Sequence, residues 1–159
     1  MDDKQAILAL LLPKAVLKPM TPEAECAVPD GMIKAGLIGI RQFPFRVGRE
    51  SRGEMVDGEF RRIERPRLGK REPNNDLYLI DAGELMHISR EHFWIESTAE
   101  GYVLFDRGSA CGTAVGAIRV GGDDTGGSAP LKDGDTIAIG ADSTPYLFTF
   151  ISGLVADSR

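Results

Sequence analysis

The sequence is poor in the residue types that most often carry catalysis or bind metal ions. Its 159 residues include only two cysteines and two histidines. The cysteines, Cys26 and Cys111, are far apart and belong to no paired Cys motif, so neither a disulfide framework nor a zinc site is indicated. We therefore expect no metal, no cofactor and a cytoplasmic location, where thiols stay reduced.

An excess of positive charge and a long apolar run are also missing. The formal net charge is -5, whereas nucleic-acid binding depends on surplus Lys and Arg that neutralise phosphates. The longest apolar run, Ala6–Leu12, is far too short to cross a bilayer. We expect neither a nucleic-acid partner nor membrane insertion.

Turn residues are plentiful instead, with 19 Gly and 9 Pro, and the apolar fraction of 42% is enough for one core. Short alternating or apolar stretches lie between them, and no window there keeps a helical period over three turns. The candidate strands are KAVLKPM, KAGLIGI, FPFRVGR, LYLID, HFWIE, YVLFD, DTIAIG and PYLFTFIS. This pattern predicts a sandwich or barrel of mainly antiparallel sheet. Trp94, within HFWIE, is expected in the core.

Two segments differ from this pattern. Residues 2–12 could form a short amphipathic helix capped by Asp2 or Asp3 and ended by Pro13, a frayed leader, or a first strand. Residues 50–75 are rich in charges of both signs, which favours a long solvated loop or hairpin over a basic site for an acidic partner.

The polar residues allow several chemistries. Ser89 and His92 could meet only across a turn, because residues three apart on a strand point to opposite faces. A Cys/His hydrolase built on Cys111 and His92 is a distant alternative, since no third group that orients the imidazole is evident. Arg49 could also form only an ion pair with Glu50 or Glu91, and Ser89 could serve only a turn.

Anion binding fits the loops better. Phosphate favours a guanidinium, a hydroxyl and backbone N–H groups presented by loops. Arg49 ends the strand FPFRVG after Gly48, Ser89 and Arg90 precede HFWIE, and the glycine-rich DRGSACGT follows YVLFD. If these three loops share one end of the fold, their polar groups converge.

The order of these motifs resembles the forkhead-associated (FHA) domain, a phosphothreonine-binding β-sandwich. The resemblance covers roughly Ala15 to Ser152. The matching segments, in order, are FRVGR, NNDLYLID, ISREHFWIE, YVLFDRGS, CGT, LKDGDTIAIG and YLFTF. It implies an all-β fold, a two-sheet, mainly antiparallel β-sandwich of the SMAD/FHA type. It also implies residues 1–13 as an extension, 14–153 as the domain with a charged insertion at about 50–75, and 154–159 as a tail.

The resemblance also implies roles for individual residues. Arg49, Ser89 and Arg90 would contact the phosphate, and His87 would select a nearby peptide residue. The resemblance implies that four further residues shape the site without contacting the ligand: Gly48, His92, Gly112 and Thr113.

The sequence departs from the family where the peptide main chain is held. Cys111 stands in place of the usual Asn, and Ala110 in place of the usual Thr or Ser, at two positions of the phosphopeptide-binding set. A thiol is a poor substitute for an amide's hydrogen bonds. The phosphate half of the site is thus retained, and the peptide half is weakened.

The sequence therefore predicts a non-enzymatic signalling module that binds phosphothreonine on a protein partner. That partner would be a Ser/Thr-kinase substrate or a kinase, in the bacterial-style assembly that the resemblance implies. The alternatives are a degenerate FHA scaffold that binds partners independently of phosphorylation, and the Cys/His hydrolase.

Overall fold

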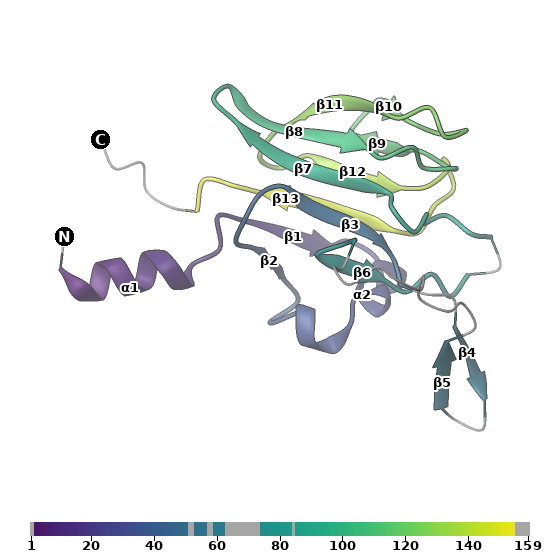
Figure 1. The fold of residues 1–159 in the computed structure, drawn as a ribbon, viewed down its shortest axis with the longest axis horizontal. Helices are drawn as coiled ribbons and strands as arrows, with labels where there is room; N and C mark the ends of the chain where they lie inside the picture. Colours follow the sequence, from purple (N-terminus) through teal and green to yellow (C-terminus); the bar gives the residue numbers. More distant parts are fainter. Residues whose placement is uncertain (1, 51–52, 57–58, 63–73, 84, 155–159) are drawn as a thin grey trace.

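In the computed structural model of the protein, the described residues are 2–50, 53–56, 59–62, 74–83 and 85–154. Two β-sheets pack face to face (Figure 1). The six-stranded sheet has, in spatial order, β10 (Ile118–Val120), β9 (Thr113–Val115), β12 (Thr136–Ile139), β13 (Leu147–Ile151), β1 (Ala15–Pro19) and β2 (Ile38–Ile40). The five-stranded sheet has β11 (Gly127–Leu131), β8 (Gly101–Asp106), β7 (Phe93–Thr98), β3 (Phe45–Arg49) and β6 (Leu77–Leu79).

Strand pairing in both sheets is antiparallel, except that β3 and β6 run parallel. The predicted all-β, mainly antiparallel sandwich is therefore confirmed. The candidate strands correspond to β1, β2, β3, β6, β7, β8, β12 and β13. Three further strands, β9, β10 and β11, were not predicted, because two of them have three residues and β11 contains Pro130.

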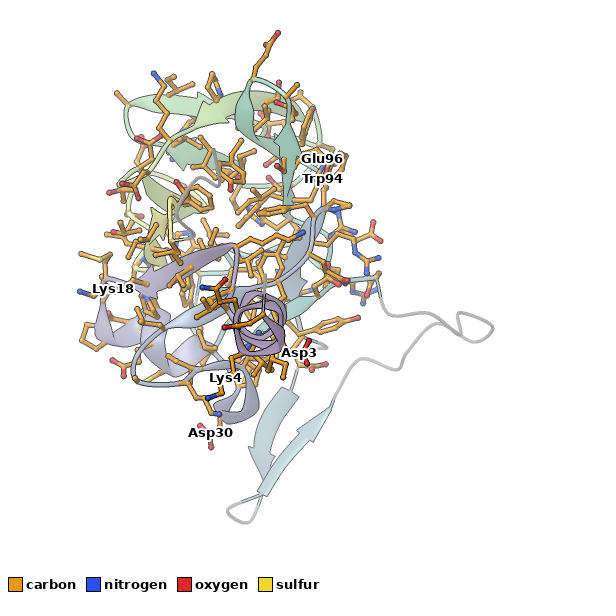
Figure 2. All side chains as sticks on the ribbon, turned by 90° about the vertical axis from the view of Figure 1, so that its left-hand side faces the viewer. Asp3, Lys4, Lys18, Asp30, Trp94 and Glu96 are labelled. Carbon is orange, nitrogen blue, oxygen red and sulfur yellow. The ribbon has the colours of Figure 1, made fainter. Side chains whose placement is uncertain are left out.

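The core lies between the two sheets and follows from alternation along each strand. On β7, Phe93 and Ile95 are fully buried, and on β13 the same holds for Phe148 and Phe150. The prediction that Trp94 lies in the core was wrong. Trp94 is half-buried on the other face of β7, where its ring stacks on Phe105 at a centroid distance of 5.2 Å. Figure 2 shows Trp94 and Glu96 together at the side of the sandwich.

Three short helices precede β3. The first, α1 (Asp3–Leu11), agrees with the helical alternative for the N-terminal segment. The second, α2 (Pro22–Ala27), was not predicted, although Thr21 caps it by accepting a hydrogen bond from the N–H of Ala24 at 3.1 Å. A 3-10 turn, η1 (Asp30–Met32), follows. In the described part of the chain, no helix is long and apolar enough to span a membrane.

The charged segment contains a two-stranded hairpin, formed by β4 (Gly53–Val56) and β5 (Glu59–Arg62). Figure 1 shows it projecting from the sandwich. The hairpin alternative that the sequence predicted for residues 50–75 is confirmed for β4 and β5. The prediction for residues 63–73 falls outside the described residues.

The sandwich has two distinct ends. Helix α1 and the C-terminal end of β13 lie at one end, at the left in Figure 1, and the end of β3 and the start of β7 lie at the other. We call the latter the loop end. It gathers residues 74–76, 80–83, 85–92, 107–112 and 140–146, which are far apart in the sequence.

Candidate functional site

A tight turn before β7 brings Ser89 and His92 together at the loop end. The backbone N–H of Ser89 donates to Nδ1 of His92 at 3.0 Å, and Nε2 of His92 lies 2.8 Å from the carbonyl oxygen of Gly112. Because Nδ1 accepts a hydrogen bond, the proton of the neutral ring belongs on Nε2 and is donated to Gly112. As expected, the two residues meet across a turn.

His92 is fully buried. Burial lowers the pKa of its imidazole below the ordinary value, although the hydrogen bond to the Gly112 carbonyl opposes this shift. The ring is therefore a neutral brace between two loops.

Three loops are joined through Ser89. Its carbonyl oxygen accepts the backbone N–H of Arg49 at 2.9 Å, and its Oγ accepts the backbone N–H of Ala110 at 3.0 Å. The end of β3, the turn before β7 and the loop after β8 thus meet at one residue. Among the described residues the Ser89 hydroxyl donates to no acceptor, so its proton is available to a ligand. Arg90, next along, is exposed.

Gly48 lies where two backbones pass too closely for any side chain. A Cβ placed there would lie 2.0 Å from the carbonyl oxygen of Arg90 and 2.6 Å from Nδ2 of Asn75. The same Nδ2 donates to the Arg90 carbonyl at 2.7 Å. The absence of a side chain at Gly48 therefore brings the Ser89–Arg90 turn against β3.

Asn75 and Arg107 support this turn, and neither was predicted as a site residue from the sequence. Asn75 is 2% exposed, and its Oδ1 accepts from Nη1 of Arg107. Arg107 Nη2 also donates to the carbonyl of Asn74 at 3.0 Å and lies 3.5 Å from Glu91. Glu91 thus pairs with Arg107. The NNDLYLID motif contains the relevant signal. Its residue Asn75 is polar and buried, and a buried polar side chain needs hydrogen-bond partners.

The loop after β8 is organised around Asp106, which is buried. Its carboxylate accepts from the N–H groups of Gly108 and Ser109, at 3.0 and 2.8 Å, and from the Ser109 hydroxyl at 2.6 Å. It also accepts from the hydroxyl of Thr113 at 2.9 Å. Asp106 therefore holds this turn together, and Thr113 shapes the loop through its contact with Asp106.

Cys111 lies between this loop and the segment before Ser89. Its thiol lies 3.3 Å from the carbonyl oxygen of Met86, to which it donates. Its carbonyl accepts from Nη1 of Arg119 at 3.2 Å. The thiol of Cys111, which stands in place of the family Asn, thus forms a hydrogen bond within the protein.

His87 lies under the loop end and is 7% exposed. A Cβ on Gly140 would lie 2.5 Å from the Cβ of His87, and the imidazole meets the ring of Tyr146 edge-on, with centroids 6.2 Å apart. Its predicted contact with a peptide residue is not tested by this arrangement and stays a prediction.

Asp81 holds the segment that leads to Ser89. Its Oδ2 accepts the N–H groups of His87 and Ile88, at 2.7 and 2.9 Å, and its Oδ1 accepts the hydroxyl of Tyr146 at 2.9 Å. Burial, and then the hydrogen bond to Asp81, raise the pKa of Tyr146 to about 12. No local sequence pattern marks this pair, because 65 positions separate the two residues.

The hydrolase alternative gains no support from this geometry. The imidazole nitrogens of His92 face Ser89 and Gly112, and the thiol of Cys111 faces Met86, so the imidazole is not placed to take the thiol proton. Within the described ranges, no group of three or more His, Cys, Asp or Glu residues could hold a metal ion.

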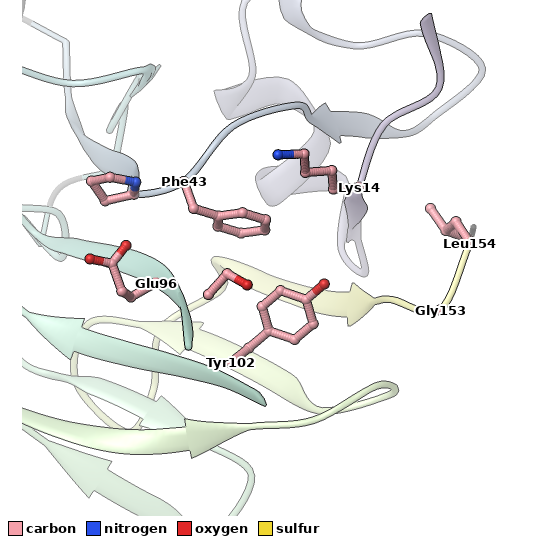
Figure 3. A pocket seen from close by; sticks show the side chains of 8 residues that line it. Lys14, Phe43, Glu96, Tyr102, Gly153 and Leu154 are labelled. Atoms are coloured by element: carbon pink, nitrogen blue, oxygen red, sulfur yellow. The ribbon is translucent and has the colours of Figure 1, made fainter. Parts of the chain in front are cut away.

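A cavity of about 550 Å³ lies at the end of the sandwich opposite the loop end (Figure 3). Its walls include Lys14, Glu96, Phe43 and Tyr102, and the two aromatic rings lie 5.3 Å apart. None of the predicted site residues lines it.

A comparison with known families identifies the domain. Residues 67–140 match the FHA domain. This part of the chain is similar to the FHA domain. The predicted resemblance is thereby confirmed. Ser89, Arg90 and Cys111 lie inside the matched range of the FHA domain, whereas Gly48 and Arg49 precede it.

Solved structures similar to this chain include three proteins. One is Mycobacterium tuberculosis EmbR in complex with a low affinity phosphopeptide, with 19% identity over 95% of this chain and a TM-score of 0.48. This chain spans 30% of that EmbR chain. The FHA domain of an Arabidopsis thaliana hypothetical protein has 22% identity, coverage of 93% and 94%, and a TM-score of 0.49. Full-length yeast Pml1p has 13% identity, coverage of 95% and 93%, and a TM-score of 0.49. No curated protein matches the chain.

Proposed function

We propose that this FHA domain binds phosphothreonine in a protein partner at the loop end, without catalysing a reaction. The observation that carries the proposal is the position of Ser89, whose main chain and side chain join the ends of three loops while its hydroxyl proton is available to a ligand. A phosphate held there would accept from this hydroxyl, with the guanidiniums of Arg49 and Arg90 supplying charge.

The supporting residues have separate tasks. Gly48 and Asn75 set the turn against β3, and His92 ties the turn to Gly112. A scaffold built in this way holds its loops in place before a ligand arrives, which reduces the entropy lost on binding. The partner is a Ser/Thr-kinase substrate or a kinase, and a cytoplasmic, kinase-regulated assembly is part of the proposal.

Binding of a degenerate phosphothreonine peptide pool, measured by fluorescence polarisation, tests this function. Wild-type protein should bind the phosphorylated pool and not the unphosphorylated one. Arg49→Ala and Ser89→Ala should each weaken binding at least about tenfold, because each removes a charge-assisted hydrogen bond to phosphate. Arg41→Gln is the matched control, since Arg41 contacts Leu11 away from the loop end.

The same experiment separates the alternatives. Equal, near-zero binding by wild type and Arg49→Ala would reject phosphate recognition and favour the phosphorylation-independent scaffold. If binding occurs, affinity should fall as the pH drops below about 6, where the phosphate loses its second charge.

A further inference from the structure

Arg119, on the edge strand β10, lies directly beside Cys111 at the loop end. Its Nη1 donates to the carbonyl oxygens of Cys111 and Gly140, at 3.2 and 3.0 Å, and its Nη2 forms an ion pair of 2.9 Å with Asp142. The Arg119 side chain is 36% exposed and that of Asp142 is 98% exposed. A positive charge is thus fixed at the surface beside the residue that replaces the family Asn.

Gly112 makes room for this guanidinium. A Cβ at Gly112 would lie 2.9 Å from Nη1 of Arg119, and the residue has a φ of +84°, which disfavours a side chain. The Gly112 carbonyl also accepts the hydrogen bonds from Nε2 of His92 and from the N–H of Gly140. Arg119 therefore packs on the same loop that His92 ties to the Ser89 turn.

The contacts of Arg119 and Ser89 fall on consecutive residues of that loop. The Ser89 hydroxyl contacts the N–H of Ala110, and the Arg119 guanidinium contacts the carbonyl of Cys111. An extended peptide advances roughly 3.3 Å per residue. A peptide whose phosphate reaches Ser89 can therefore bring a side chain a few residues away to Arg119.

The guanidinium has donors left for such a side chain. Arginine carries five N–H groups, and the contacts described above use Nη1 twice and Nη2 once. Asp142 is almost fully exposed, and exposed ion pairs contribute little to stability. A ligand carboxylate can replace Asp142 at small cost, and its two oxygens match the fork of the guanidinium.

We propose that Arg119 selects an acidic side chain near the phosphothreonine, in place of main-chain contacts that Cys111 does not make, and that Asp142 is an internal competitor for it. This inference rests on the proposed phosphothreonine binding. It names a preferred ligand class: phosphothreonine peptides with an Asp or Glu within a few residues of the phosphate.

A set of short phosphothreonine peptides tests the proposal. Each has one flanking position occupied by Asp or by its neutral isostere Asn, with Ala and Ser elsewhere. The readout is the ratio of the Asn-peptide Kd to the Asp-peptide Kd, from fluorescence polarisation. In wild type we expect a ratio of about 3 to 10 for at least one position, typical of a partly exposed charge pair.

Three variants test whether the guanidinium of Arg119 causes this preference. Arg119→Gln should reduce the ratio to about 1, because the Asp peptide then meets no cation there, and the ratio cancels any change in affinity that both peptides share. Asp142→Asn should raise the ratio, and Arg119→Lys, which keeps the charge, should retain part of it. Thermal unfolding of each variant verifies that it is folded.

Three results would overturn the proposal, and they differ in what else they reject. An unchanged ratio in Arg119→Gln rejects the role of Arg119 alone. A wild-type ratio near 1 at every position rejects acidic selection, while phosphate-dependent binding still supports the proposed function. No phosphate-dependent binding of any peptide rejects both.

Discussion

The Nδ1 atom of His92 accepts a hydrogen bond from the backbone N–H of Ser89 at 3.0 Å. Through this contact the buried imidazole supports the turn at Ser89, because its other nitrogen, Nε2, is held by the Gly112 carbonyl on a different loop. The residue that shapes the site therefore lies beneath the residue proposed to contact the ligand.

The burial of His92 predicts how the free energy of unfolding depends on pH. Burial lowers the pKa of His92 below 6.5 in the folded protein, so the unfolded chain binds a proton more readily. The free energy of unfolding should therefore fall as the pH drops below about 6.5, by at most about 1.4 kcal/mol per pH unit for this group. Urea denaturation from pH 7.5 to about 5 measures this loss.

A matched pair of histidine variants separates this effect from other groups. His92→Ala should lose about 2–4 kcal/mol at pH 7.5, because it leaves a cavity and the partly buried Ser89 N–H without an acceptor, and its stability should depend less on pH. His87→Gln should keep the His92 contribution. A pH dependence that is the same in wild type and His92→Ala would contradict the assignment.

Gly48→Ala should destabilise the protein by about 1–3 kcal/mol or more, because the new methyl group would meet the Arg90 carbonyl and force the two backbones apart. Phosphopeptide affinity should also fall, since the turn moves with Arg90. Gly31→Ala is the control: nothing lies within 4 Å of its Cβ position, and its effect should be within about 0.5 kcal/mol. Equal stability of the two variants would show that the close approach is not required.

The raised pKa of Tyr146 predicts a loss of stability at high pH. Its pKa is raised to about 12 in the folded protein, whereas the unfolded chain ionises near 10, so the free energy of unfolding should decline as the pH rises above about 10. Tyr146→Phe should remove this contribution and cost about 1–2 kcal/mol at neutral pH, because Asp81 loses a hydrogen bond. Tyr102→Phe, compared by chemical denaturation, should retain the decline; a decline unchanged in Tyr146→Phe would contradict the prediction.

The two cysteines should differ in reactivity. Cys26 is exposed, whereas Cys111 is half-buried and donates its thiol to Met86. A thiol-reactive probe followed by mass spectrometry should therefore label Cys26 first and Cys111 more slowly than free cysteine. Faster labelling at Cys111 than at free cysteine would revive the hydrolase alternative.

Cys111→Asn should strengthen phosphopeptide binding if the position faces the peptide main chain as the resemblance implies. One restored hydrogen bond is worth about 0.5–1.5 kcal/mol, or roughly twofold to twelvefold in Kd. Cys111→Ser, measured in the same polarisation assay, controls for loss of the thiol. A Cys111→Asn variant that binds no better than Cys111→Ser would place the peptide elsewhere.

The sequence by itself determined eight strands of the two sheets and the polar residues at the ends of several of them. Alternation in HFWIE specified β7, since successive residues of a strand point to opposite faces. The turn residues marked the connections, and Arg49, Ser89 and Cys111 were identified from their order along the chain.

Only the tertiary structure decided which of these residues meet and what supports them. Trp94 lies on the outer face because Phe93 and Ile95 occupy the core face and Phe105, on the adjacent strand, offers a ring to stack on. The pairs Asp81–Tyr146 and Arg119–Cys111 join separate strands and loops at the loop end. Such contacts depend on how two sheets pack, and no local pattern of side chains encodes that packing.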